Sequence, residues 1–272
     1  MPTVQVRGAN YFYQEAGSGT ETIVFAHGFL MNGDMFQPQI EALQKDYRCI
    51  AFDWRGQGRS EATPDGYDMD ELYLDALELL EKLNAIPCHW VGLSMGGFVG
   101  IRIGARKPEL LKSLVLAETS AEAEDPRKMI KWKTLAYIFR FFGVGPVKKP
   151  ITKTLFGQKI LNDPSRQDVV ARFQSNWDRL DKAATMKTAM AIFHRKSVVE
   201  ELPKISVPTL IITGDQDIAR TSDEAKRMKD LIPNSQLVVI PGAGHSSSIE
   251  EPESFTNALK AFWKTLKEES QK

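Results

Sequence analysis

The sequence is poor in cysteine, with only Cys49 and Cys88 in 272 residues. Both lie in apolar runs that we expect to form β-strands. So little cysteine fits a reducing compartment, and we predict a cytoplasmic protein. Histidine is also rare, and its four copies show no metal-ligand spacing, so we expect no metal site.

An excess of one charge and long apolar runs are absent as well. The 35 basic and 35 acidic residues cancel, so the net charge indicates neither a nucleic-acid nor a membrane partner. No segment reaches the ~18 consecutive apolar residues of a membrane span. Residues 1–5 lack the basic start and apolar stretch of a signal peptide. We therefore predict no nucleic-acid binding and no stable membrane insertion.

Strand-like and helix-like segments alternate along most of the chain, which is 42% hydrophobic and long enough to bury a large core. A hairpin of residues 4–6 and 11–13 is expected at the sheet edge, with further strands at residues 23–26, 47–52, 89–92, 113–117, 209–213 and 236–240. Helices are expected between them at residues 35–44, 69–83, 95–107, 222–232 and 252–266. This alternation predicts a mostly parallel sheet covered on both faces.

Residues 121–201 interrupt the alternation and contain no convincing strand. They predict helices at residues 127–142, 147–155, 166–178 and 182–195. Within the first helix, five apolar residues recur at helical spacing and indicate one apolar face: Ile130, Leu135, Ile138, Phe139 and Phe142.

The most informative motif is Gly92-Leu93-Ser94-Met95-Gly96-Gly97, which lies between a strand-like and a helix-like run. A G-x-S-x-G in this context places the serine on a sharp turn, with its hydroxyl clear of the backbone. The flanking glycines leave room for the neighbouring turn. Ser94 is therefore the candidate nucleophile.

Other polar candidates also follow predicted strands. His27-Gly28-Phe29 follows the strand at 23–26, Asp215 and Asp217 follow the strand at 209–213, and His245 follows the strand at 236–240. Open α/β sheets place their sites at this end of the strands. The chain order of the candidates is Ser, Asp, His.

With these motifs, the chain resembles the α/β-hydrolase superfamily from about residue 23 to residue 263, including the segment Asp53-Trp54-Arg55-Gly56-Gln57-Gly58-Arg59-Ser60. Within it, the motifs look most like small cofactor-free serine esterases, enol-lactonases and perhydrolases. The resemblance implies a mostly parallel eight-stranded sheet with a helical cap inserted after the sixth strand. The core domain would comprise residues 1–120 and 202–272, and the cap residues 121–201. The implied strand order separates the two cysteines by another strand, so we expect no disulfide.

The resemblance assigns a role to each site residue. His245 would be the base that activates Ser94, and Asp217 would hold the other imidazole nitrogen. The N–H groups of Phe29 and Met95 would bind the oxyanion. Two other carboxylates compete with Asp217 for the role of triad acid: Asp215 and Glu118. His27 is expected to tie loops together.

The cap is rich in large apolar side chains, which either pack its helices or line an apolar pocket. As substrate-binding candidates we name Phe139, Phe142, Trp177 and Phe193. We predict hydrolysis of small to medium, largely apolar esters or lactones through an acyl-enzyme. The alternatives are carbon–carbon bond hydrolysis, cofactor-free perhydrolysis or haloperoxidation on the same triad, and a ligand receptor with residual hydrolysis. The sequence leaves monomer and homodimer open.

One charge asymmetry lies in the predicted cap, because residues 126–162 contain nine Lys or Arg and no Asp or Glu. The simplest interpretation of these basic residues is that they lie on the solvated outer face of amphipathic helices. Two functional interpretations are attraction of acidic substrates and docking on anionic lipid.

Overall fold

A computed structural model of the chain describes residues 2–269. Met1 and residues 270–272, at the outer ends of the predicted core segments, lie outside the described residues. Eight strands form one sheet in the order β1-β2-β4-β3-β5-β6-β7-β8. The strands are β1 (Thr3–Val6), β2 (Ala9–Ala16), β3 (Thr22–Ala26), β4 (Arg48–Phe52), β5 (Cys88–Leu93), β6 (Leu111–Ala117), β7 (Thr209–Gly214) and β8 (Ser235–Ile240).

Strands β3 to β8 run parallel, while β1 and β2 form the antiparallel edge that the sequence predicted. All residues of β3, β5 and β7 are buried. Such strands read as continuous apolar runs because helices cover both faces of a parallel sheet. The predicted fold class is confirmed.

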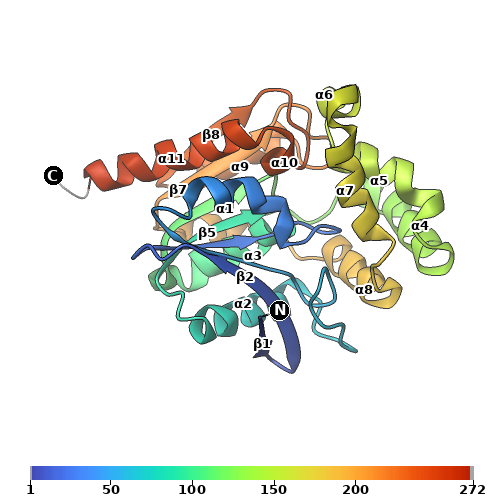
Figure 1. Ribbon diagram of the computed structural model, residues 1–272, viewed down its shortest axis with the longest axis horizontal. Coiled ribbons are helices and arrows are strands. Elements are labelled where there is room, and N and C mark those ends of the chain that lie inside the picture. The colour runs from blue at the N-terminus through green and yellow to red at the C-terminus, as the bar shows by residue number, and fades with distance from the viewer. Residues whose placement is uncertain (1, 270–272) are drawn as a thin grey trace.

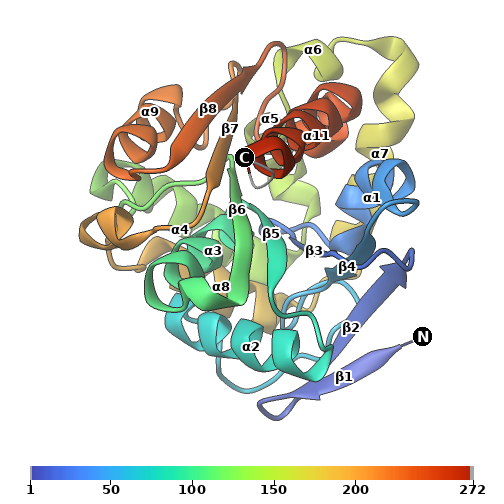
Figure 2. The same ribbon diagram turned by 90° about the vertical axis from the view of Figure 1, so that its left-hand side faces the viewer.

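Helices cover the two faces of the sheet (Figures 1 and 2). On one face α2 (Met69–Lys82), α3 (Met95–Arg106) and α9 (Ser222–Leu231) share a hydrophobic cluster. On the other face, α1 (Gln37–Leu43) and α11 (Pro252–Glu269) pack into a second cluster. Both clusters also contain side chains from the strands, so apolar packing stabilises the sheet on both faces.

Between β6 and β7 the chain forms only helices, gathered at the right-hand end of Figure 1. They include α4 (Pro126–Phe142), α5 (Lys148–Leu155), α6 (Gln158–Leu161), α7 (Gln167–Trp177) and α8 (Lys182–Phe193). The sequence predicted four of them and missed α6, as it missed α10 (Ser247–Glu250), because four residues are too few to show a helical period. The division into core and cap domains stays a prediction.

One expectation for α4 is wrong. Its apolar residues do not form a single buried face, because Ile130 is 77% and Phe142 is 74% exposed, whereas Phe139 is buried. Apolar residues occur around most of this helix, so their spacing alone does not say which of them face the protein.

Cys49 on β4 and Cys88 on β5 are both free and buried, and β3 lies between their strands. This agrees with the expectation of no disulfide. Within residues 2–269, no helix has the length and apolar character needed to cross a bilayer.

Candidate active site

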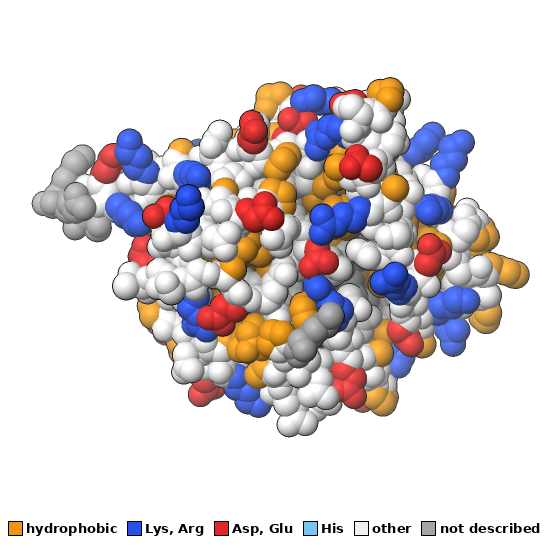
Figure 3. Space-filling model, in the orientation of Figure 1, with side chains coloured by type: hydrophobic (Ala, Val, Ile, Leu, Met, Phe, Trp, Pro, Cys, Tyr) orange, Lys and Arg blue, Asp and Glu red, His pale blue; other side chains and the backbone are white. Residues whose placement is uncertain are grey.

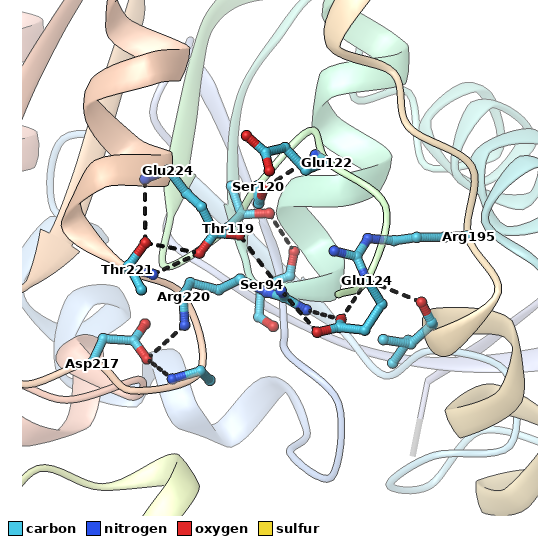
Figure 4. Close-up of polar contacts among 12 residues, drawn as sticks. Ser94, Thr119, Ser120, Glu122, Glu124, Arg195, Asp217, Arg220, Thr221 and Glu224 are labelled. Carbon is cyan, nitrogen blue, oxygen red and sulfur yellow. Dashed lines mark hydrogen bonds and ion pairs between the residues drawn. The ribbon is translucent and has the colours of Figure 1, made fainter. Parts of the chain in front are cut away.

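Ser94 occupies the sharp turn between β5 and α3. Its backbone has φ 52° and ψ −108°, a conformation that costs a non-glycine residue about 1–3 kcal/mol. Two neighbours hold it there: the Ser94 N–H donates to Ala117 O at 2.8 Å, and Thr119 Oγ1 donates to Ser94 O at 2.8 Å (Figure 4). The end of β6 and the residues just after it therefore hold Ser94 in this strained backbone conformation.

The glycines on either side of Ser94 are needed for close backbone approach. A Cβ at Gly92 would overlap the carbonyl oxygen of Gly96, and a Cβ at Gly96 would overlap the carbonyl oxygen of Ala26. Any side chain at either position would push α3 away from the sheet. The turn therefore requires glycine at both positions.

The structure brings Ser94, His245 and Asp217 together from three segments that are distant in sequence. His245 Nε2 lies 2.9 Å from Ser94 Oγ, and His245 Nδ1 lies 2.8 Å from Asp217 Oδ2. Asp217 follows β7 and His245 follows β8, at the same end of the sheet as the turn after β5. All three residues are at least nine-tenths buried.

Asp217 is fixed by two further hydrogen bonds. Its Oδ1 accepts the backbone N–H of Ala219 at 2.7 Å and that of Arg220 at 3.0 Å. Oδ2 is thus left for His245, whose Nδ1 must carry a proton to donate to a carboxylate. The Nε2 lone pair of the neutral ring then faces the Ser94 hydroxyl.

Neither competing carboxylate makes a recorded hydrogen bond with His245. Asp215 Oδ1 accepts the Gly242 N–H at 2.7 Å and so braces the turn after β8. Glu118 follows β6 and is almost fully buried, and the polar groups within its reach are those of Ser247 and Gly214, not His245. Burial, followed by the charge of Asp217, raises the pKa of Glu118 well above its ordinary value, which favours the neutral acid.

The two residues expected to supply the oxyanion donors are Met95, which follows Ser94, and Phe29. The N–H of Met95 is the first of α3, and first-turn N–H groups have no carbonyl partner within their own helix. Phe29 lines the same cavity as Ser94. The loop before it is held by His27, whose Nε2 accepts the Trp54 N–H at 2.9 Å and whose Nδ1 lies 2.7 Å from Gly28 O. Burial lowers the pKa of His27, so its ring is neutral and ties loops together.

Glu250 on α10 organises the loop that carries His245. Its carboxylate accepts the N–H groups of Gly244 at 3.0 Å and Ser246 at 2.9 Å, one on each side of His245, and of Gly157 at 2.7 Å. Burial raises the pKa of Glu250, and the three amides oppose this. The sequence analysis missed this residue, since no motif marks a carboxylate on a four-residue helix.

A cavity of about 140 Å³ lies against Ser94 and His245. Most of its wall comes from the helices between β6 and β7, and its apolar lining includes Leu30, Trp132, Leu135, Ala136, Phe139, Ile151, Leu155, Met186, Ala189, Ile192 and Phe193. Of the four substrate-binding candidates, Phe139 and Phe193 are in this lining.

The other two candidates lie elsewhere, which corrects the sequence interpretation. Phe142 is 74% exposed at the end of α4, about one turn beyond Phe139. Trp177 is buried as a packing residue, with its indole N–H donated to Leu30 O at 2.9 Å. A buried indole needs a hydrogen-bond acceptor, and the backbone of the loop after Phe29 supplies it.

Glu124 and Arg220 in the cavity wall form a buried charge cluster with Arg195 behind them (Figure 4). Glu124 Oε2 lies 2.6 Å from Arg220 Nη2 and 2.8 Å from Arg195 Nη1. Burial alone would raise the pKa of Glu124, but the two guanidinium groups hold it below its ordinary value. Burial and the charge of Arg220 lower the pKa of Arg195 to about 10. The spacing of these residues in the sequence does not predict that they pair.

A comparison with protein families identifies the fold family. The family model described as alpha/beta hydrolase fold matches residues 21–252. The chain belongs to this family. The predicted hydrolase is therefore confirmed at the level of reaction class.

Similar proteins of this family have named activities. The chain is 30% identical to 3-oxoadipate enol-lactonase 1 of Acinetobacter baylyi over 248 residues, which are 90% of this chain and 89% of the lactonase. A thermophilic esterase from Thermogutta terrifontis superposes with a TM-score of 0.90 at 26% identity, covering 97% of this chain and 99% of the esterase. The enol-lactonase from Burkholderia xenovorans LB400 gives a TM-score of 0.90 at 27% identity, covering 97% and 100%.

Proposed function

We propose that the protein hydrolyses carboxylic esters or lactones through an acyl-enzyme formed on Ser94. The observation that carries this proposal is the continuous hydrogen-bonded relay from Ser94 Oγ through His245 to Asp217. A serine hydroxyl is a weak nucleophile at neutral pH and needs a base within hydrogen-bond reach. The neutral Nε2 of His245 is such a base.

In the proposed reaction, Ser94 Oγ attacks the ester carbonyl while His245 Nε2 takes its proton. Asp217 stabilises the imidazolium, and the N–H groups of Met95 and Phe29 stabilise the oxyanion. The tetrahedral intermediate collapses when His245 gives the proton to the leaving oxygen. Water, deprotonated by the same ring, then attacks the acyl-enzyme and releases the acid.

The cavity suggests the size of the group that it binds. An apolar cavity of about 150 Å³ holds a molecule such as benzene, so a cavity of about 140 Å³ accepts a short acyl chain or one small ring. This agrees with the names of the relatives, which act as an esterase and as enol-lactonases. We include in the proposal that residues 121–201 act as a cap over this cavity.

Two measurements test the proposal. A fluorophosphonate probe should label Ser94, as located by peptide mass spectrometry. A panel of p-nitrophenyl esters and simple lactones should give turnover that falls steeply beyond short acyl chains. Ser94→Ala should lose both labelling and turnover, whereas the control Ser235→Ala, a serine on β8, should keep them. Undiminished hydrolysis by Ser94→Ala would refute the proposed nucleophile.

Two further assays separate the alternative reactions of the same three residues. Addition of hydrogen peroxide and a halide with a halogen-accepting dye reports peracid formation. A vinylogous diketone reports carbon–carbon bond hydrolysis. Higher kcat/KM in either assay than with every ester and lactone would replace the ester proposal with that reaction.

A further inference from the structure

Helix α4 has apolar side chains on two opposite faces. Its inner face contributes Trp132, Leu135, Ala136 and Phe139 to the cavity lining. On the outer side, Ile130 is 77%, Tyr137 is 53% and Phe141 is 69% exposed. Single exposed apolar residues are common, but a cluster of large ones on one helix marks an interaction surface.

The exposed residues form a stripe. At 100° per residue, Tyr137 and Phe141 project within about 20° of the direction of Ile130. Along the helix, Thr134 lies between Ile130 and Tyr137, and its hydroxyl donates to Ile130 O at 2.8 Å. We call Ile130, Thr134, Tyr137 and Phe141 the outer stripe.

Cations flank the outer stripe on both sides. By the same geometry, Lys133 and Arg140 project about 60–80° to one side, and Arg127 and Lys131 about 60–100° to the other. Figure 3 shows orange and blue side chains together at the right-hand edge, where α4 lies.

This positive charge is largely uncompensated. Residues 126–162 contain nine Lys or Arg and no Asp or Glu. Only two of the nine have an ion pair recorded within residues 2–269: Arg127 with Asp125, and Lys159 with Glu251. Exposed charges more than about 8 Å away are largely screened at physiological salt, so the zero net charge of the whole chain does not cancel the local field.

We propose that the outer stripe docks on an anionic lipid surface, with the axis of α4 parallel to the membrane plane. A helix in this position needs an apolar centre, which enters the boundary between headgroups and acyl chains, and cations on both flanks, which meet lipid phosphates. The outer stripe provides the apolar centre, and Lys133 and Arg140 on one flank and Lys131 on the other provide the cations, while Arg127 is already paired with Asp125. A convex helix ridge fits a deformable lipid surface without requiring a complementary groove in a partner.

Docking would place the cavity next to the bilayer, because the inner face of α4 lines the cavity. An apolar ester dissolved in lipid would then reach Ser94 without crossing much water. The inference does not depend on the proposed function, since vesicle binding is measured without substrate.

The test measures co-sedimentation of the full chain with vesicles of phosphatidylcholine, with and without phosphatidylserine. We expect binding only to the vesicles with phosphatidylserine, and release at high salt. Phe141→Ser should weaken binding roughly ten-fold or more. Lys133→Gln with Arg140→Gln should weaken it roughly five-fold for each cation removed.

Matched controls test whether the outer stripe itself binds. Leu74→Ser removes an exposed apolar residue from α2, and Lys260→Gln removes an exposed cation from α11; both should bind as the parent does. Hydrolysis of a soluble short-chain ester by Phe141→Ser, at the parent rate, shows that the variant is folded. Glycerophosphoserine, the headgroup without acyl chains, should not compete.

Three outcomes would overturn the proposal. They are no binding of the parent chain to either vesicle, equal loss of binding in the control variants, and full competition by glycerophosphoserine. The last would assign the surface to soluble phosphate groups.

Discussion

Asp217→Asn is expected to remove nearly all turnover, although it replaces only one oxygen by an NH2 group. In the native site, Oδ1 accepts the N–H groups of Ala219 and Arg220, and Oδ2 faces His245. An asparagine satisfies the two amides with its oxygen, so its NH2 group turns toward His245. The imidazole must then accept at Nδ1 and carry its proton on Nε2, where it cannot take the proton of Ser94.

The expected magnitude follows from this change of tautomer. A comparable reversal in a serine hydrolase triad lowers kcat roughly 10⁴-fold, which is about 5.5 kcal/mol of transition-state free energy. KM should change little, because Asp217 is not part of the cavity lining. Steady-state kinetics on a p-nitrophenyl ester give both constants, and thermal unfolding checks that the variant is folded.

Glu118→Gln is the matched control for this prediction. Glu118 is buried and makes no hydrogen bond with His245, and its raised pKa favours the neutral acid. Glutamine has the same shape and no charge, so kcat should stay within about a few-fold of the parent. A severe loss in Glu118→Gln together with a mild one in Asp217→Asn would refute the assignment of the acid.

Three further predictions concern other parts of the structure. Gly96→Ala should lower kcat/KM by orders of magnitude and destabilise the fold, because its methyl group would overlap Ala26 O; Gly145→Ala, where nothing lies within 4 Å of an added Cβ, is the control in the same kinetic and unfolding assays. Glu124→Gln should lower the free energy of unfolding by about 3–5 kcal/mol in urea titrations, because it takes the carboxylate from the buried Arg195 and leaves Arg220 with only the longer 3.7 Å pair to Glu224; an unchanged urea midpoint would contradict this. Burial lowers the pKa of His89 from 6.5 to about 4, so as pH falls the unfolded chain takes up a proton before the folded chain does. The free energy of unfolding should therefore fall by about 3 kcal/mol between pH 6.5 and about pH 4. Ser113 Oγ lies 2.8 Å from His89 Nδ1, and His89→Asn keeps an acceptor for this hydroxyl. In this variant that loss of stability at acid pH should disappear. If the free energy of unfolding falls equally with pH in both proteins, another group is responsible.

The parts of the site that could be predicted from the sequence depend on local rules. The turn at Ser94 needs glycine on both sides because the backbone of α3 approaches β3 and β5 closely. Asp217 and His245 could be placed because each follows a strand of the parallel sheet, and parallel strands end at one edge of the sheet. These rules involve only neighbours in sequence or strand order.

The lining of the cavity could be predicted only in part, because it depends on which side of each helix meets the core. Phe139 and Phe142 fit the same helical period, yet the first is buried against the cavity and the second is exposed. The outer stripe was hidden for the same reason, since apolar residues on both sides of α4 resemble one broad apolar face. Only the packing of α4 against the body separates them.

The residues that position the site lie beyond prediction from spacing because their partners are distant in sequence. Glu250 joins both neighbours of His245 to Gly157, 93 residues away along the chain. Arg220 donates its backbone N–H to Asp217, while its guanidinium pairs with Glu124, 96 residues away, in the cavity wall. The same loop therefore holds the carboxylate that is hydrogen-bonded to His245 and supplies a charged group to the cavity wall. Because both contacts involve one residue, a change in the charged wall also affects the loop that carries Asp217, and the two effects must be separated by comparing KM with kcat.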